Sequence, residues 1–339
     1  MNSQNPVLAQ LGWNTHFISQ LEQEEFDKYR PVRVVAVHRN ALQVIGEGIN
    51  TTIPPLYDDE ADEEDRATVG DWLLVDPYAM RARRLLSRKS FFKRRAAGTG
   101  RGLQLIAANV DTLFIVSSCN QDFNVARLER YLALAREADV IPVIVLTKAD
   151  LADDPIAYVQ KATSIMPGLL VEALDARNPE DVANLKLWCG SGQTVAFLGS
   201  SGVGKSTLVN TLMERSEVAT GGVREDDDKG RHTTTGRQMH KLDAGGWLID
   251  TPGMRELQLT DVRHGIDDVF ADISALAQDC RFSDCQHDGE PDCAVLAAIE
   301  IGELEEQRFR RYRKLLLEDR FNSESLAQRR SRDRAFGKM

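Results

Sequence analysis

Short apolar runs separated by turn-forming residues characterise the chain from residue 31 to about 95. The runs are VRVVAVH (32–38), ALQVIGEG (41–48) and DWLLVDPY (71–78). Gly, Asp and Pro punctuate them, and runs of this length predict the strands of a small β-barrel of the OB-fold type. The acidic run DDEADEED (58–65) is expected to be a loop, and the glycine-containing AAGTGRG (96–102) a linker.

Beyond residue 102, apolar runs alternate with helical patterns. Strands are predicted at VDTLFIVSS (110–118), VIPVIVL (140–146), GLLVEAL (168–174), QTVAFLG (193–199) and GWLID (246–250). Residues 124–138 carry apolar side chains at helical spacing, and STLVNTLM (206–213) begins another helix. This alternation predicts a mostly parallel sheet with helices on both faces. From about residue 270 the pattern is helical around a cysteine-rich loop.

Composition is that of a soluble globular protein, with 42% hydrophobic and 28% charged residues. No apolar run approaches the ~20 residues that span a bilayer, and the N-terminus MNSQNPVLAQLGW lacks the features of a signal peptide. We therefore expect a cytoplasmic protein that does not enter membranes. Five cysteines, an odd number, fit a reducing compartment and metal binding better than disulfides.

The segment GSSGVGKST (199–207) fits the phosphate-loop pattern G-x-x-x-x-G-K-[ST], between an apolar strand and a helix. Its glycines let backbone N–H groups face phosphate oxygens at the positive end of the helix. Lys205 is expected to reach the β- and γ-phosphates, and Ser206 to bind Mg²⁺. The predicted phosphate-binding residues are Gly199, Ser200, Ser201, Gly202, Val203, Gly204, Lys205, Ser206 and Thr207.

Two downstream segments complete the expected phosphate site. DTPG begins with Asp250 after a strand, so Asp250 can hold Mg²⁺ through water while the Gly253 N–H contacts the γ-phosphate. GRHTTT (230–235) offers a hydroxyl for the same groups, as switch I does in GTPases; the alternatives are Thr233, Thr234 and Thr235. The water-positioning glutamine is missing after DTPG. His232 is the catalytic candidate, with a structural role as the alternative.

The tetrapeptide TKAD consists of Thr147, Lys148, Ala149 and Asp150. It resembles the guanine-reading motif N-K-x-D of GTPases, with Thr147 in place of Asn. A carboxylate accepts two hydrogen bonds from the N1–H and N2 amino groups of guanine, whereas adenine offers no such pair. The motif therefore predicts GTP rather than ATP, although TKAD by itself could start a surface helix.

The order of the motifs along the chain is unusual. Glu172-Ala173-Leu174 resembles the S-A-K/L motif whose backbone contacts guanine, and both base-reading segments precede the phosphate loop. The order TKAD, EAL, GSSGVGKST, GRHTTT, DTPG is that of a circularly permuted GTPase, because nearby termini allow permutation without loss of the sheet. DTPG then leads directly into the C-terminal part, so loss of the γ-phosphate could act on whatever that part binds.

Four residues of metal-binding type follow the pattern C-x4-C-x-H-x5-C: Cys280, Cys285, His287 and Cys293. Three thiolates and one imidazole match a closed tetrahedral zinc site of the structural kind. Cys293 precedes the helix-like stretch AVLAAIEIGELEEQRF (294–309), whose dipole favours a thiolate. The alternative is four ordinary side chains. Cys119 and Cys189 stand alone and are expected to be packing residues.

Together these segments predict a multidomain α/β protein of 339 residues. We expect an N-terminal extension and OB-fold barrel over residues 1–100 and a central circularly permuted P-loop GTPase domain over 101–268. A mainly helical zinc-binding domain with a basic tail is expected over 269–339. The expected cofactors are one structural Zn²⁺ per chain and Mg²⁺ with GTP.

The whole set of segments resembles the RsgA (YjeQ) family of bacterial GTPases. The matching segments span nearly the full chain: GDWLLVD, IAANVDTLFIVSS, FNVARLERYL, GSSGVGKSTLVN, GRHTTT, LIDTPGMREL and CRFSDCQHDGEPDCAV. The resemblance implies an OB-fold, a permuted GTPase domain and zinc on the four residues named above. It also implies GTP hydrolysis stimulated by the small (30S) ribosomal subunit, late maturation near its decoding region, and release after hydrolysis.

The net charge of −10 argues against a protein coated in nucleic acid, but the charges are segregated. A basic segment near the end of the predicted barrel, interrupted by Phe91 and Phe92, could contact 16S rRNA: Arg83, Arg84, Arg88, Lys89, Lys93, Arg94 and Arg95. The alternative is that both phenylalanines pack while the charges stay exposed. The tail RRSRDRAFGKM (329–339) is a second RNA-contacting candidate.

The leading hypothesis is a monomeric GTPase that binds GTP and GDP and whose partner is the small ribosomal subunit. One alternative is a nucleotide-gated RNA-binding module in which hydrolysis only times release. Another is a permuted GTPase that serves a different RNA or protein.

Overall fold

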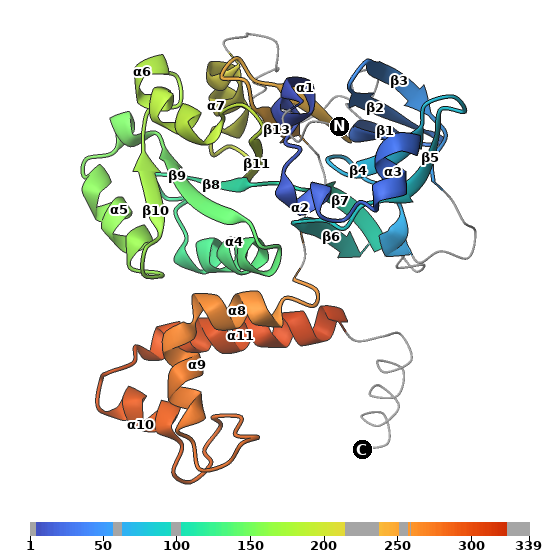
Figure 1. The fold of residues 1–339 in the computed structure, drawn as a ribbon. Helices are drawn as coiled ribbons and strands as arrows, with labels where there is room; N and C mark the ends of the chain where they lie inside the picture. Colours follow the sequence, from blue (N-terminus) through green and yellow to red (C-terminus); the bar gives the residue numbers. More distant parts are fainter. Residues whose placement is uncertain are drawn as a thin grey trace, which may run out of the picture. The chain divides into compact units, whose positions relative to one another are not determined.

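The computed structural model describes residues 5–56, 63–95, 103–213, 237–250, 257 and 259–323. The chain divides into two compact units, which we call unit 1 and unit 2. Unit 1 comprises Met1–Asn124 and Ala138–Leu257, and unit 2 comprises Val125–Glu137 and Gln258–Met339. Figure 1 shows that strands dominate the centre of unit 1, whereas unit 2 consists of helices.

The centre of unit 1 is a parallel sheet. Its strands are β8 (Thr112–Ser118), β9 (Ile141–Thr147), β10 (Leu170–Ala173), β11 (Thr194–Leu198) and β13 (Trp247–Asp250). They lie in the order β10-β9-β8-β11-β13, each parallel to its neighbour. Every residue of β8 and β11 is buried, which explains why these segments form nearly unbroken apolar runs. The parallel strands expected from the sequence are therefore present.

An antiparallel extension joins this sheet to the N-terminal part of unit 1. In it, β12 (Arg237–Lys241) pairs with β13 and with β1 (Arg30–His38). Four more strands continue from β1: β2 (Ala41–Gly46), β3 (Ile49–Ile53), β4 (Trp72–Asp76) and β5 (Arg81–Leu85). β2 and β4 pair with β1, and the edge strands β3 and β5 pair with β2 and β4, giving one 11-stranded mixed sheet.

The closed OB-type barrel expected within residues 1–100 is not seen among the described strands. Closing the small sheet would require its two edge strands, β3 and β5, to pair, and they do not pair in the part of the chain that the structure describes. Both strands expose polar or charged side chains, including Asn50 and Arg81, which suits open edges. One edge of β1 is also shared between β4 and β12, so the small sheet continues into the central one.

A separate hairpin and short helices complete unit 1. β6 (Phe91–Arg95) pairs with β7 (Leu103–Ala108), and the expected linker 96–102 between them lies outside the described residues. The helices are α1 (Pro6–Gln10), α2 (Thr15–Ile18), α3 (Gln23–Lys28), α5 (Pro155–Thr163), α6 (Pro179–Val182) and α7 (Lys205–Leu212). Short 3-10 helices are η1 (Glu63–Asp65), η2 (Ala149–Leu151) and η3 (Ala183–Trp188).

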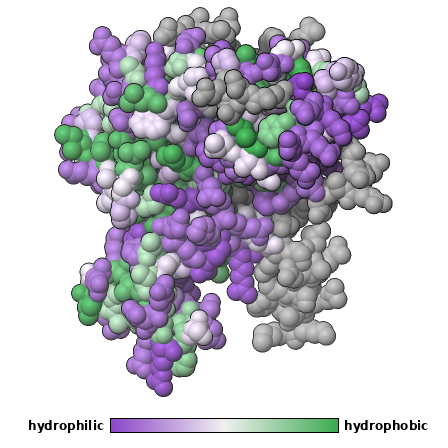
Figure 2. All heavy atoms as spheres, viewed as in Figure 1, coloured by the Kyte–Doolittle hydropathy of each residue, from purple (hydrophilic) through white to green (hydrophobic). Residues whose placement is uncertain are grey.

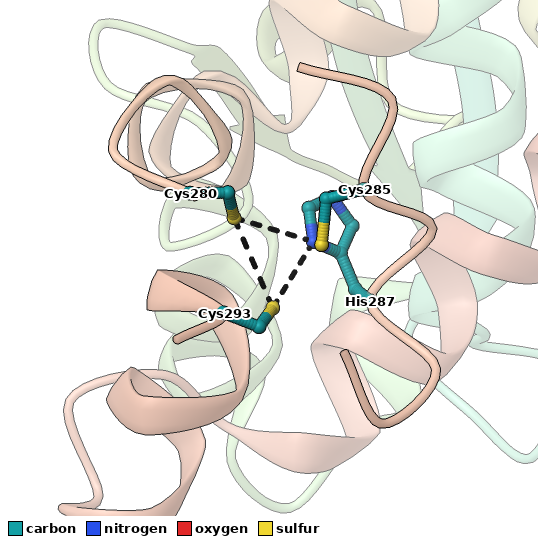
Figure 3. A group of neighbouring side chains, drawn as sticks. All are labelled: Cys280, Cys285, His287 and Cys293. Atoms are coloured by element: carbon teal, nitrogen blue, oxygen red, sulfur yellow. Dashed lines mark hydrogen bonds between the residues drawn. The ribbon is translucent and has the colours of Figure 1, made fainter. Parts of the chain in front are cut away.

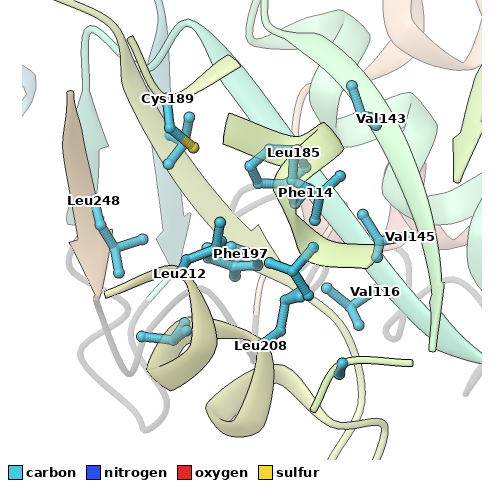
Figure 4. Close-up of a cluster of buried hydrophobic side chains, with 14 of the residues drawn as sticks. Phe114, Val116, Val143, Val145, Leu185, Cys189, Phe197, Leu208, Leu212 and Leu248 are labelled. Carbon is cyan, nitrogen blue, oxygen red and sulfur yellow. The ribbon is translucent and has the colours of Figure 1, made fainter. Parts of the chain in front are cut away.

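Among the described residues, two apolar clusters contribute to the core of unit 1. In the larger one, Phe114 of β8 and Phe197 of β11 lie with Leu208 of α7 (Figure 4). Burial of a large apolar side chain contributes about 1.5–3 kcal/mol, so this cluster holds the helix that follows the phosphate loop on the sheet. The smaller cluster, under the N-terminal strands, includes Val34 and Leu73.

Arg33 of β1 is a buried charge that ties three segments together. Only 1% of its surface is exposed, and its guanidinium donates to the carbonyl oxygens of Leu11, Gly70 (3.3 Å) and Asn109 (3.1 Å). Burial lowers the pKa of Arg33 to about 10, although the negative charge of Asp111 acts to raise it. The guanidinium therefore stays protonated at neutral pH. The buried Arg33 guanidinium thus links the N-terminal helices, the small sheet and the start of the central sheet through hydrogen bonds.

Unit 2 consists mainly of helices, in line with the pattern expected for the C-terminal region. They are α4 (Val125–Glu137), α8 (Arg263–Val269), α9 (Ala271–Gln278), α10 (Ala294–Glu300) and α11 (Glu306–Ser323). The helix-like stretch 294–309 is divided between α10 and α11 by a turn at 301–305. Along the chain α4 connects β8 to β9, yet its contacts place it in unit 2.

Charged and close contacts hold α4 to α8 and α11. Glu129 is fully buried in α4, where it accepts a hydrogen bond from Arg311 (2.7 Å) and pairs with Arg308 (3.5 Å). Gly265 of α8 approaches the α4 backbone so closely that a Cβ atom there would lie 2.0 Å from the carbonyl oxygen of Ala133. Because an unpaired buried carboxylate is costly, these partners fix α4 within unit 2.

Hydrophilic residues cover most of the face seen in Figure 2, while hydrophobic residues gather at the left of the view, over α5 and β10. Ile156 in α5 is 67% exposed and Leu170 in β10 is 46% exposed. Within the described ranges, no helix has both the length and the hydropathy to cross a membrane.

Substitution of Arg33 tests whether its hydrogen bonds hold the three segments together. Arg33→Met keeps an apolar stem of similar length but leaves three buried carbonyl oxygens without their donor, so we expect the free energy of unfolding to fall by about 3 kcal/mol or more. Urea unfolding followed by tryptophan fluorescence measures this, because Trp72 lies next to Arg33. The control is Arg39→Met at an exposed position. Equal midpoints for the two variants would contradict the assignment.

Candidate functional site

The phosphate loop connects β11 to α7, as its sequence pattern predicts. Gly204 precedes the helix with a φ of 93°, in the left-handed region that favours glycine, and α7 begins at Lys205. Lys205 is buried, and its Nζ donates to the carbonyl oxygens of Gly199 (2.7 Å) and Ser200. The ammonium group thus lies inside the curve of the loop, next to the backbone that would cradle phosphate.

Thr147, the last residue of β9, contacts this loop directly. Its hydroxyl donates to the carbonyl oxygen of Val203 at 2.6 Å and lies 3.1 Å from that of Ser117. The side chain is fully buried, and a Cβ atom on Gly204 would lie 3.4 Å from its Oγ1. Two segments far apart in the sequence therefore meet at one edge of the sheet. Thr147 thus joins the TKAD segment to the phosphate loop through a side-chain hydrogen bond.

The chain turns sharply after Thr147. Lys148 has a φ of 57°, in the left-handed region, which is costly for a residue with a side chain. The turn leads into η2 and leaves Asp150 exposed at the surface of the loop. The Ala149 N–H donates to the carbonyl oxygen of Leu174 at 3.3 Å. The TKAD and EAL segments, both proposed from the sequence to read guanine, are therefore neighbours.

Arg177 reaches this group of residues from the loop after β10. Its Nη2 donates to Asp150 Oδ2 at 2.7 Å, and its guanidinium also binds the carboxylate of Asp175. The sequence offered no signal for this contact, because Arg177 and Asp150 are 27 positions apart and belong to different loops.

The remaining predicted phosphate-site residues are described only in part. Ala196 of β11 pairs with Ile249 of β13, so the backbone of Asp250 lies near the end of β11, where the phosphate loop begins. The Asp250 side chain is outside the described part of the structure. The RNA-contacting candidate 329–339 also lies outside the described residues, as do five other site candidates: His232, Thr233, Thr234, Thr235 and Gly253.

The four predicted metal ligands come together in unit 2. Ligand atoms of Cys280, Cys285, His287 and Cys293 all lie within 4.8 Å of one another (Figure 3). The Sγ atoms of Cys280 and Cys293 are 3.8 Å apart, and His287 Nδ1 is 3.3 Å from Cys293 Sγ. A tetrahedral Zn²⁺ with Zn–S bonds of about 2.3 Å separates its sulfur ligands by roughly 3.8 Å. The cluster can therefore hold one ion of this kind.

The surroundings of Cys280 and His287 favour the charge states that metal binding needs, whereas burial raises the pKa of the Cys285 thiol to about 11. Burial opposes ionisation of Cys280, but backbone N–H groups of Val295 and Ala294, at the start of α10, outweigh it and lower the pKa of the thiol. Burial lowers the pKa of His287, which favours a neutral imidazole able to bind metal. Cys119 and Cys189 are buried in unit 1 and do not belong to the cluster, as expected for packing residues.

Comparison with known proteins decides the family. The family described as RsgA GTPase matches residues 85–260. The small ribosomal subunit biogenesis GTPase RsgA 2 of Vibrio parahaemolyticus is 50% identical over 345 residues, covering 100% of this chain and 93% of its own. The small ribosomal subunit biogenesis GTPase RsgA of Mesorhizobium japonicum is 51% identical over 326 residues, covering 95% and 93%. The chain belongs to the RsgA GTPase family.

Solved structures agree with this family assignment. YjeQ from Thermotoga maritima is 27% identical with a TM-score of 0.63, covering 86% of this chain and 98% of its own. YloQ, described as a circularly permuted GTPase, has a TM-score of 0.61 and covers 90% and 100%. At 20% identity, YloQ supports the fold alone. The family resemblance and the circular permutation inferred from motif order are thus confirmed.

In this RsgA-family chain, the basic segment suggested for RNA contacts is largely ion-paired. Arg84 binds both carboxylate oxygens of Glu25 at 2.8 Å, and Arg88 binds both oxygens of Asp71 at 2.8 and 2.9 Å. The expectation that these charges stay exposed is wrong for Arg88, whose side chain is 12% exposed. The alternative that the phenylalanines pack is confirmed for Phe92, which is 3% exposed.

Substitution of Thr147 tests the hydrogen bond that joins the TKAD segment to the phosphate loop. Thr147→Val keeps the shape of the side chain but removes the hydroxyl, so the buried carbonyl oxygen of Val203 loses its donor and the free energy of unfolding should fall by about 1–3 kcal/mol. Guanine nucleotide affinity should fall with it. Chemical unfolding and nucleotide titration measure the two effects. Thr147→Ser retains the hydroxyl and serves as the control. If Thr147→Val is as stable as Thr147→Ser and binds nucleotide as tightly, the hydrogen bond does not have the proposed role.

Metal analysis tests the cluster in unit 2. Cys285→Ser removes one thiolate, so bound zinc should fall well below one ion per chain and protease sensitivity within residues 279–293 should rise. Atomic emission spectrometry and limited proteolysis provide the readouts. Cys119→Ala is the matched control, because its thiol is buried elsewhere. Retention of one zinc ion per chain by Cys285→Ser would show that the ligand set is wrong.

Proposed function

We propose that this protein hydrolyses GTP and acts in late assembly of the small (30S) ribosomal subunit. The observation that supports the first part is the 2.6 Å hydrogen bond from Thr147 to Val203, because it joins the TKAD segment, which we propose reads guanine, to the loop that we propose binds phosphate. The partner is inferred from the family and from the relatives, which are named small ribosomal subunit biogenesis GTPases.

In this proposal one loop binds the base of the nucleotide and another binds its phosphates. The Asp150 carboxylate accepts hydrogen bonds from the N1–H and N2 amino groups of guanine, while the Lys148 side chain covers the base. The N–H groups of the loop 199–207 bind the phosphates, and Lys205 balances their charge. Ser206 and Asp250 would hold the Mg²⁺ that accompanies GTP. Among the residues outside the described ranges, Thr233–Thr235 and Gly253 would contact the γ-phosphate, and His232 would position the attacking water.

We assign Zn²⁺ to the cysteine–histidine cluster, with a structural role. Four protein ligands leave no open position for substrate, so the ion would stabilise the loop between α9 and α10. Apolar side chains alone would support this loop poorly, because residues 281–292 contain only one large hydrophobic residue, Phe282, and it is 41% exposed.

The proposed partner determines where the protein acts. We propose that a monomer works in the cytoplasm, binds 16S rRNA near the decoding region, and leaves the subunit after hydrolysis. The proposed functional parts are residues 1–100, 101–268 and 269–339. Because DTPG is followed along the chain by α8, loss of the γ-phosphate has a short covalent path to the helical unit.

Measurement of GTP turnover with purified ribosomal subunits tests this function. We expect slow intrinsic turnover, because the usual water-positioning glutamine is missing, and an increase of at least about tenfold when small subunits are added. Large subunits at the same concentration should have no such effect. Lys205→Ala should abolish both rates.

Co-sedimentation tests binding to the small subunit separately from GTP hydrolysis. With a non-hydrolysable GTP analogue, the protein should remain bound to small subunits, and GDP should release it. A rate that is unaffected by small subunits, together with no co-sedimentation, would favour another RNA or protein partner.

A further inference from the structure

The carboxylate proposed to read guanine is held by an arginine from a different loop. Arg177 Nη2 donates to Asp150 Oδ2 at 2.7 Å. The same guanidinium makes two hydrogen bonds to Asp175, from Nε to Oδ1 at 3.0 Å and from Nη2 to Oδ2 at 3.1 Å. Arg177 thus connects the two carboxylates, and Asp175 supplies most of its bonds.

The loop that carries Arg177 is itself well braced. The Arg177 N–H donates to Asp175 Oδ1 at 2.9 Å, and the Asp175 N–H donates to Asp181 Oδ2 at 3.0 Å. The Ala149 N–H bonds to the carbonyl oxygen of Leu174, which joins this loop to the TKAD segment through the backbone. The guanidinium is therefore held mainly by its own loop, and Asp150 is its partner outside that loop.

Hydrogen-bond capacity allows Arg177 and guanine to share the carboxylate. An ionised carboxylate has about four acceptor positions, two on each oxygen. The contact with Arg177 occupies one position on Oδ2, and guanine would need one on each oxygen. We propose that Arg177, braced by Asp175, is a positioning residue that holds the Asp150 carboxylate in the orientation required for two hydrogen bonds to guanine. This inference rests on the proposed binding of a guanine nucleotide.

The size of the effect follows from exposure. The Arg177 side chain is 66% exposed and that of Asp150 is 29% exposed, so solvent screens the pair. Exposed ion pairs of this kind change an equilibrium by about 1.4- to 5-fold. A contribution to selectivity is therefore expected, and complete loss of nucleotide binding is not.

Binding of GDP and IDP to an Arg177→Gln variant tests the proposal. Hypoxanthine, the base of IDP, lacks the exocyclic amino group and so makes only one of the two bonds to the carboxylate. Loss of orientation should weaken GDP more than IDP, and the GDP-to-IDP affinity ratio should fall by about two- to fivefold. The diphosphates avoid turnover during calorimetric titration. A general loss of stability would lower both affinities without changing their ratio.

A double-mutant cycle tests whether Asp175 acts through Arg177. Asp175→Asn should lower the ratio in the same direction, and the double variant should lose no more than the stronger single variant, since both changes break one connection. Arg310→Gln is the control, because Arg310 also forms an exposed ion pair, with Glu306 at 2.6 Å in α11. It should leave the ratio unchanged.

Asp150→Asn distinguishes failure of this inference from failure of the proposed nucleotide. That variant should lose GDP and gain XDP, because the amide reverses one hydrogen bond. If it does so while Arg177→Gln leaves the GDP-to-IDP ratio unchanged, or raises GDP affinity, the positioning role is overturned and the guanine site stands. If Asp150→Asn keeps the preference for GDP, both proposals are overturned.

Discussion

Alignment of parallel strands is the constraint on which the candidate site depends. β8 pairs with both β9 and β11, so the carboxyl ends of β9 and β11 lie at the same edge of the sheet. At that edge the Thr147 hydroxyl reaches the carbonyl oxygen of Val203. The chain order of the two segments is irrelevant to this contact, because pairing of neighbouring strands determines it. Circular permutation therefore changes the connections while leaving the site intact.

The connections created by permutation lead out of the site in two directions. β12, which follows the segment 214–236, pairs with β13 on one side and with β1 on the other, so the central sheet continues into the N-terminal strands. After β13 the chain passes to α8, which is packed against α4. Because α4 also connects β8 to β9, unit 2 is attached to the central sheet at both ends of that helix as well as through the DTPG segment.

The buried charges Arg33 in unit 1 and Glu129 in unit 2 both have several polar partners. Arg33 donates to three carbonyl oxygens in unit 1, and Glu129 accepts from two arginines in unit 2. The basic segment that begins in β5 behaves similarly, since Arg84 and Arg88 make two hydrogen bonds each to one carboxylate. Surface charge read from the sequence as an RNA contact is thus partly internal structure, and ion pairs within the fold reduce the positive charge available to a partner.

Local sequence alone determined the features that need only neighbouring residues. Buried strands appeared as apolar runs, α4 as a helical pattern, and the phosphate loop and metal cluster as fixed spacings. The sequence did not reveal β5, because RARRL is charged and lies at an edge, nor the open sheet, because closure depends on pairing between distant strands. Only the tertiary structure brought Arg177 to Asp150 and Arg33 to three separate carbonyls. Such contacts arise from packing between segments, and no short stretch of sequence encodes them.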